Sequence, residues 1–220
     1  MMMKATISTR FDGYYLLPLL FSPEMVRAHL DGMKHETRRP TGSGMYGHAR
    51  AALHEGRKVF GWVRESWYAS YDTDEGIVGY DDLPKPSRAT CPTASCWYQA
   101  DEELKPAARQ FQPPTRWVPP MHMPFSRHRL FMRIRSIEQE RLSSLCETGA
   151  VREGVVVLIG RSGTGFVGSA QSLFREIWSS MYGHWCDTDS VWVLRYDRPQ
   201  QGNVADYISI ERAIERDLVA

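Results

Sequence analysis

The run Lys34–Arg39 carries an amine, an imidazole, a carboxylate, a hydroxyl and two guanidinium groups in consecutive positions. Within it, Lys34 and Thr37 could act as base and nucleophile, since a hydroxyl is inert until a base removes its proton. A lysine can be that base only if its pKa falls from about 10.4, which burial or the neighbouring Arg38 and Arg39 would favour. The alternative is an ordinary surface loop of solvated polar residues.

The segment before this run predicts a helix that ends where the polar residues begin. Ser22 can cap the helix, Pro23 suits its first turn, and Gly32 can close it in a left-handed conformation. Pro40 keeps the residue before it extended. The polar run is therefore expected to be a loop that leaves the helix and enters a strand.

The spacing of Lys34 and Thr37 restricts how the two side chains can meet. They are an odd number of residues apart, so on a straight strand they would face opposite sides. A turn after Gly32 would allow both side chains to face inward.

The remaining elements indicate an α+β fold. Strands are expected near 58–68, 96–100, 128–137 and 190–197, and helices near 143–154, 169–183 and 209–220. Because strands outnumber helices and do not alternate with them regularly, we expect a small mixed β-barrel with flanking helices. A single domain would span 1–199, with long loop insertions at about 71–95, 102–115 and 156–170. Residues 200–220 would form a C-terminal tail that could be helical.

Composition narrows the classes of partner. The chain has 220 residues, 42% of them hydrophobic, and a net charge of +1, which gives no overall attraction to nucleic acid. Residues 104–137, however, contain seven Lys or Arg and no acid, which can make a local phosphate-attracting surface. Arg38, Arg39, Arg127 and Arg129 are the candidate phosphate ligands, and a solvated sheet face is the alternative for the arginines near 129–135.

Aromatic residues offer a second mode of recognition. Trp62 and Trp67 could stack on a base, although a place in the core is the more common role for either tryptophan. Arg64 and Glu65 are adjacent, so only one of them would face a cleft on a strand. His122 lies between prolines, where a packing role competes with a role in the site.

Cofactors and membranes are not indicated. The four cysteines lack the C-x2-C spacing of a zinc site, so we predict reduced thiols and no metal. A G-x-G-x-x-G pattern at 163–168 follows its apolar run too late for a dinucleotide fold, so we expect no cofactor there. No signal peptide or membrane-length apolar run is present, which predicts a cytoplasmic protein.

Five pieces of the chain, in order, are similar to proteins with an ASCH domain, especially the longer forms of phages and prophages. They are "LLFSPEMVRAHLDGMKHETRRP", "GWVRESW", "WVPPMHMPFSRHRLFMRI", "AVREGV" and "SVWVLRYDRP". The resemblance implies a PUA-like barrel that binds RNA or a modified nucleoside.

The resemblance also implies candidate catalytic residues. In one compact branch the domain is an amidohydrolase that deacetylates 4-acetylcytidine, and its lysine, threonine and glutamate correspond to Lys34, Thr37 and Glu153. This chain departs from that branch because it is about twice as long and has His35 in place of a threonine. A ribonuclease and a non-catalytic RNA-binding module are the alternatives.

Overall fold

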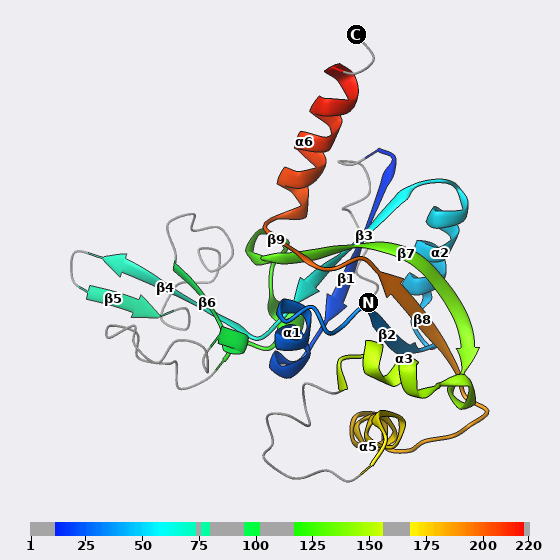
Figure 1. The fold of residues 1–220 in the computed structure, drawn as a ribbon. Helices are drawn as coiled ribbons and strands as arrows, with labels where there is room; N and C mark the ends of the chain where they lie inside the picture. Colours follow the sequence, from blue (N-terminus) through cyan, green and yellow to red (C-terminus); the bar gives the residue numbers. More distant parts are fainter. Residues whose placement is uncertain (1–11, 74–75, 80–94, 102–116, 156–167, 218–220) are drawn as a thin grey trace.

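The computed structural model describes residues 12–73, 76–79, 95–101, 117–155 and 168–217 (Figure 1). It confirms a mixed α+β fold with a mostly antiparallel main sheet. In the described residues, no helix has both the length and the apolar character needed to cross a membrane.

The main sheet has the strand order β1-β3-β7-β8-β2, and β9 pairs with the start of β7. Only β1 and β3 run parallel. The bounds are β1 (Tyr14–Leu20), β2 (Glu36–Pro40), β3 (Lys58–Arg64), β7 (Leu130–Arg141), β8 (Ser190–Tyr196) and β9 (Gln200–Gln201). The expected barrel is not closed by strand pairing: the structure shows an open sheet with β1 and β2 as its two edges.

A second, three-stranded sheet has the order β5-β4-β6 and extends away from the main sheet (Figure 1). Its strands are β4 (Trp67–Thr73), β5 (Gly76–Gly79) and β6 (Ser95–Tyr98). The strand expected near 96–100 therefore belongs to this sheet and not to the main one. The insertion expected at 71–95 begins with the end of β4 and holds β5. Its residues 74–75 and 80–94, like 102–115 and 156–167, lie outside the described part of the chain.

Helices cover the main sheet and begin close to where the sequence places them, apart from one that was missed. They are α1 (Pro23–Leu30), α2 (Gly44–His54), α3 (Glu147–Arg152), α5 (Ala170–Tyr182) and α6 (Val204–Asp217). The sequence pattern did not predict α2. The tail helix was predicted, but α6 begins earlier than the expected 209. Short 3-10 turns lie at Gln99–Asp101, Pro120–His122, Phe125–Arg127 and Leu142–Ser144.

The first helix has the predicted ends. The Ser22 side chain accepts a hydrogen bond from the Met25 amide (3.4 Å), and Gly32 adopts φ +70° after the last turn. Strand β2 begins at Glu36, earlier than the expected end of the loop. Thr37 and Arg39 are therefore strand residues, and strand alternation governs where their side chains point.

The core lies on both faces of the main sheet. One face packs on α1 and α2 through residues such as Leu17, Leu19, Met132, Ile134 and Leu194. The other face is covered at one end by α5 and α3 and at the other by α6. Because neighbours along a strand alternate, Val193 and Phe131 belong to that second face.

Candidate functional site

Lys34 and Glu153 form a buried ion pair between two distant parts of the chain. Lys34 Nζ lies 2.8 Å from Glu153 Oε2, and the two side chains are 2% and 4% exposed. A β-bridge joins the two residues. Glu153 caps the end of α3, and Gly154 follows at φ +80°. A Cβ at Gly154 would lie 2.8 Å from Ala28 and 3.1 Å from Lys34, so a glycine is needed for this close approach.

The hydrogen bonds of Lys34 match its charged form. Its Nζ donates to the Glu36 carbonyl oxygen (3.0 Å), to the Glu153 carbonyl oxygen (2.8 Å) and to the Glu153 carboxylate. Three acceptors match the three N–H groups of an ammonium. Burial lowers the pKa of Lys34, Glu153 raises it, and Arg39 lowers it. The net direction is downward, so proton loss is easier than for an exposed lysine although the resting geometry suits the cation.

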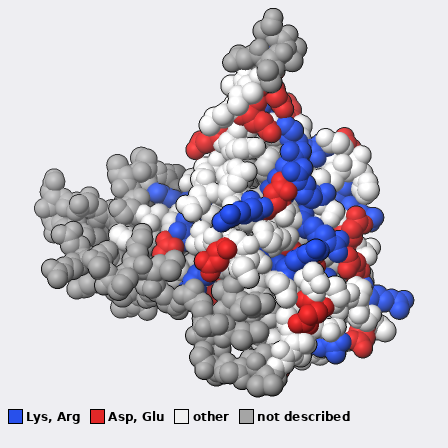
Figure 2. All heavy atoms as spheres, viewed as in Figure 1, with Lys and Arg blue, Asp and Glu red and all other residues white. Residues whose placement is uncertain are grey.

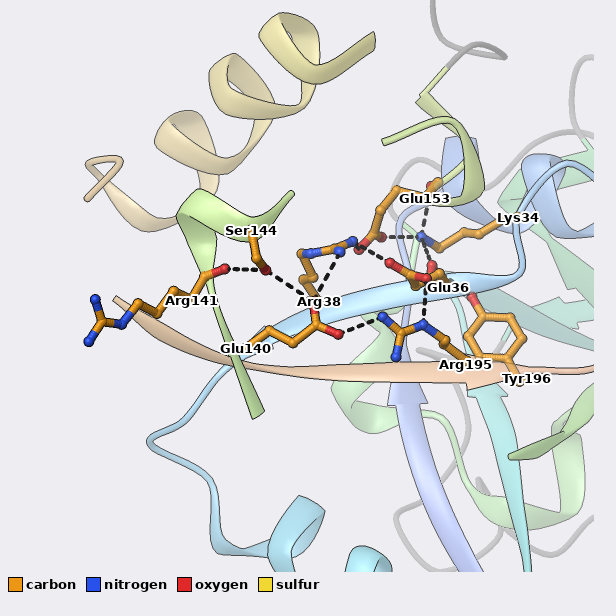
Figure 3. A network of polar contacts seen from close by, with 9 residues as sticks. All are labelled: Lys34, Glu36, Arg38, Glu140, Arg141, Ser144, Glu153, Arg195 and Tyr196. Carbon is orange, nitrogen blue, oxygen red and sulfur yellow. Dashed lines mark hydrogen bonds and ion pairs between the residues drawn. The ribbon is translucent and has the colours of Figure 1, made fainter. Parts of the chain in front are cut away.

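Glu153 also contacts Arg38, which extends the pair into a network (Figure 3). Arg38 Nη1 lies 3.3 Å from Glu153 Oε1 and 2.6 Å from Glu36 Oε1. Arg195 then joins Glu36 (3.0 Å) to Glu140 (2.5 Å). The Arg38 side chain is 3% exposed and faces three carboxylates, so this arrangement does not support its predicted role as a phosphate ligand, which stays a prediction.

Thr37 does not join the Lys34–Glu153 pair. It is buried in β2 between Glu36 and Arg38, which both face the network, so alternation turns Thr37 to the opposite side. None of the hydrogen bonds found among the described residues links its hydroxyl to Lys34 or Glu153. The sequence thus predicted the lysine–glutamate contact correctly, and the expected inward turn of Thr37 towards Glu153 is absent.

Arg39 shares the side of β2 that Thr37 occupies. Its Nη2 donates to the Leu20 carbonyl oxygen (2.6 Å), and its guanidinium lies 5.0 Å from the centre of the Phe21 ring. Lys34 Nζ lies 5.6 Å from the same ring. Arg39 therefore links the two edge strands in this structure, and its role as a phosphate ligand stays a prediction.

His29 and Tyr196 belong to the site but were not predicted. His29 Nε2 lies 3.0 Å from the Tyr196 hydroxyl, which donates to the Glu36 carbonyl oxygen (3.2 Å). That oxygen also accepts from Lys34, so Tyr196 helps to fix it. Burial lowers the pKa of His29 and raises that of Tyr196. No motif in the sequence pointed to either residue, since their contact joins α1 to β8.

The two tryptophans proposed for base stacking are core residues. Trp67 is fully buried, and Trp62 is 4% exposed and packs edge-on against Phe125 and beside His128. Arg64 lies over the Trp62 ring and donates to the Met121 carbonyl oxygen. The packing interpretation is therefore the correct one for both tryptophans.

The remaining predicted binding residues lie at the junction of the two sheets. Arg129 binds both carboxylate oxygens of the buried Glu65 (2.9 and 3.0 Å), binds Asp101 (2.7 Å) and stacks on Tyr98. Arg129 is thus paired with two carboxylates in this structure, and its role as a phosphate ligand stays a prediction. Burial raises the pKa of Glu65, and Arg129 lowers it. Arg127 is half-buried and His122 is exposed; neither contributes to the Lys34 network.

Comparisons with protein-family models, curated proteins and solved structures gave no match. Within the described residues, no group of three or more His, Cys, Asp or Glu side chains is arranged to hold a metal ion.

Proposed function

We propose that the protein is an ASCH-type hydrolase that removes the acyl group from an N-acylated cytidine, with Lys34 and Glu153 at its centre. One observation supports this proposal above all others. A lysine and a glutamate 119 residues apart meet at 2.8 Å in a buried pair, as the family resemblance led us to expect. The substrate would be an RNA or a free nucleoside, and the protein would act in the cytoplasm.

The geometry favours a cationic role for Lys34 over the role of resting base. During reaction a substrate carbonyl would replace one of its three acceptors, and the ammonium would stabilise the developing oxyanion. Glu153 would accept the proton of the attacking group and pass it to the N4 amine as the C–N bond breaks, so that the acyl group leaves as a carboxylic acid and cytidine is released. In this structure Thr37 faces away from Glu153, so the attacking group is a water molecule; the Thr37 hydroxyl could attack only after β2 turned it towards Glu153, and water would then hydrolyse the acyl-threonine. Since the pair is closed to solvent, substrate entry requires the site to open.

Acetate release from 4-acetylcytidine tests the proposal. The wild type should turn over, and Lys34→Met and Glu153→Gln should each lose several orders of magnitude in kcat/KM. Thr37→Ala decides the nucleophile: loss of turnover that Thr37→Ser partly restores identifies the hydroxyl, and retained turnover identifies water. Thr188→Ala, at an exposed threonine, is the matched control. A folded wild type without turnover would refute the hydrolase.

A non-catalytic RNA-binding module is the second candidate. It is favoured by the completeness of the network, in which three cations (Lys34, Arg38, Arg195) balance three carboxylates (Glu36, Glu140, Glu153). Such a module would bind RNA without releasing acetate. Cleavage of RNA by the wild type, abolished in Glu153→Gln, would instead indicate the ribonuclease alternative.

A further inference from the structure

Three arginines near the Lys34–Glu153 pair have no acidic partner. Arg133, Arg152 and Arg198 have neither an ion pair nor a side-chain hydrogen bond among the described residues, and all are at least partly exposed. We call these three residues the arginine face. Figure 2 shows Lys and Arg side chains gathered between α6 and α3, over the region where Figure 1 places β7 and β8. This is the part of the sheet that the helices leave uncovered.

Backbone contacts place these arginines on neighbouring segments. The Arg152 carbonyl accepts from the His35 amide (2.9 Å), and the His35 carbonyl accepts from the Tyr196 amide (3.1 Å). The next residue, Asp197, donates its amide to the Arg133 carbonyl (3.0 Å). The Arg198 guanidinium lies 3.3 Å from the position of a Cβ on Gly32. The face therefore follows the segments that carry the ion pair, since Arg152 precedes Glu153 and His35 follows Lys34.

Most nearby carboxylates are already paired. Asp197 binds Arg135 (2.6 Å), and Glu36 and Glu140 bind Arg195. Asp31 is exposed beside Gly32 and has no ion pair among the described residues, so it reduces the local positive charge. Three guanidiniums thus keep their hydrogen-bond donors for an external anion.

We infer that the arginine face binds the phosphodiester backbone of a single-stranded nucleic acid whose acylated cytidine enters the Lys34–Glu153 site. This inference rests on the proposed function. From Arg152 to Arg133 the face crosses three inter-chain spacings, or about 14 Å at about 4.8 Å each. One phosphate accepts hydrogen bonds only from groups about 3 Å away, so a face of this width suits successive phosphates of a strand.

The test measures binding of a fluorescein-labelled oligocytidine by anisotropy over a range of salt concentrations. The variant R133Q/R152Q/R198Q should bind at least tenfold more weakly. Its plot of log affinity against log salt should be shallower by about 2, since each single-strand phosphate contact contributes about 0.7. The control R141Q/R175Q/R216Q removes the same charge from exposed arginines elsewhere and should bind like the wild type. An equal loss in both variants would show a general charge effect and overturn the inference.

Further experiments distinguish an oligonucleotide from a single nucleotide or a free nucleoside as the ligand. RNA and DNA oligomers should bind alike, because the arginines would contact phosphates and not the 2′-hydroxyl. A cytidine monophosphate that competes as well as the oligomer would overturn the multi-phosphate face. Deacetylation of the free nucleoside without oligomer binding would overturn this inference and leave the hydrolase intact. Arginine-dependent oligomer binding without deacetylation would support phosphate binding by the arginine face, and would refute the hydrolase together with the entry of an acylated cytidine into its site.

Discussion

The Arg39 guanidinium, on edge strand β2, donates to the carbonyl oxygen of Leu20, the last residue of the opposite edge strand β1 (2.6 Å). The main sheet is therefore open in its backbone pairing, yet its two edges come within reach of one side chain. Phe21, which follows Leu20, lies beneath both Arg39 and Lys34. This contact places the Lys34–Glu153 pair beside the gap between the edges.

Replacing Arg39 tests the contribution of that contact. Arg39→Met keeps an apolar stem near Phe21 but removes the donor, so it should lower the free energy of unfolding by about 1.5–3 kcal/mol. Urea denaturation measures the change. Arg198→Met, at an exposed arginine without an ion pair among the described residues, should change it by less than about 0.5 kcal/mol. Equal effects would show that Arg39 does not hold the edges together.

The buried ion pair should show strong coupling. Glu153→Gln leaves the buried Lys34 ammonium without its carboxylate and should cost about 3–5 kcal/mol. The double variant Lys34→Met/Glu153→Gln should recover part of this loss, because no unpaired lysine remains. A double-mutant cycle in urea measures the coupling. For comparison, Arg135→Gln breaks an exposed pair with Asp197 and should cost less than about 1 kcal/mol. Additive effects at Lys34 and Glu153 would contradict the coupling.

Arg129 should act as a structural clamp between the two sheets. Arg129→Lys removes the two-pronged contact with Glu65 and leaves a single charge to share with Asp101. Amide hydrogen exchange should therefore accelerate in β4 and β6, while oligocytidine affinity stays near that of the wild type. A loss of affinity without faster exchange would return Arg129 to the phosphate-binding role predicted from sequence.

Local sequence signals predicted the elements better than their arrangement. The caps at Ser22 and Gly32 located α1, and alternation located β7 and β8. Whether strands close into a barrel depends on how far the edges approach, which no local pattern encodes; here Arg39 spans the gap. The α2 helix was missed because its N-cap residue Ser43 makes no side-chain cap hydrogen bond and its first turn contains two glycines, Gly44 and Gly47.

The sequence predicted only part of the site, again because local patterns do not show which distant segments meet. The contact between Lys34 and Glu153 followed from family resemblance, since no spacing rule links residues 119 positions apart. The ion pairs of the arginines could not be predicted, because a basic stretch does not show where the carboxylates lie. Arg38 and Arg129 face acids from distant segments, whereas Arg152 and Arg198, outside the basic stretch, do not.

His128 holds the start of α6 and requires a neutral imidazole. Its Nδ1 donates to the Phe125 carbonyl oxygen (2.5 Å), and its Nε2 accepts from the Val204 amide (2.9 Å). Protonation of Nε2 would replace that acceptor with a donor facing a donor. Burial lowers the pKa of His128, whereas the Phe125 carbonyl and Asp206 raise it. Trp62 also packs beside the ring, and Arg64 lies over that tryptophan.

This geometry predicts an acid-sensitive α6. Because the folded pKa of His128 lies below the unfolded value of about 6.5, the unfolded state binds more protons just below that pH. Stability should be complete above about pH 6.5 and fall as the pH drops towards the folded pKa, by at most about 1.4 kcal/mol per pH unit for one histidine. His128→Gln should make the free energy of unfolding, measured with urea, depend less steeply on pH in that window. His54→Gln, at an exposed histidine, should leave the wild-type slope.

A residual slope in His128→Gln is expected from His29, whose pKa is also lowered by burial. Hydrogen exchange should locate the effect, with α6 amides losing protection first on acidification. If His128→Gln kept the full wild-type slope, the link between His128 protonation and α6 would be wrong.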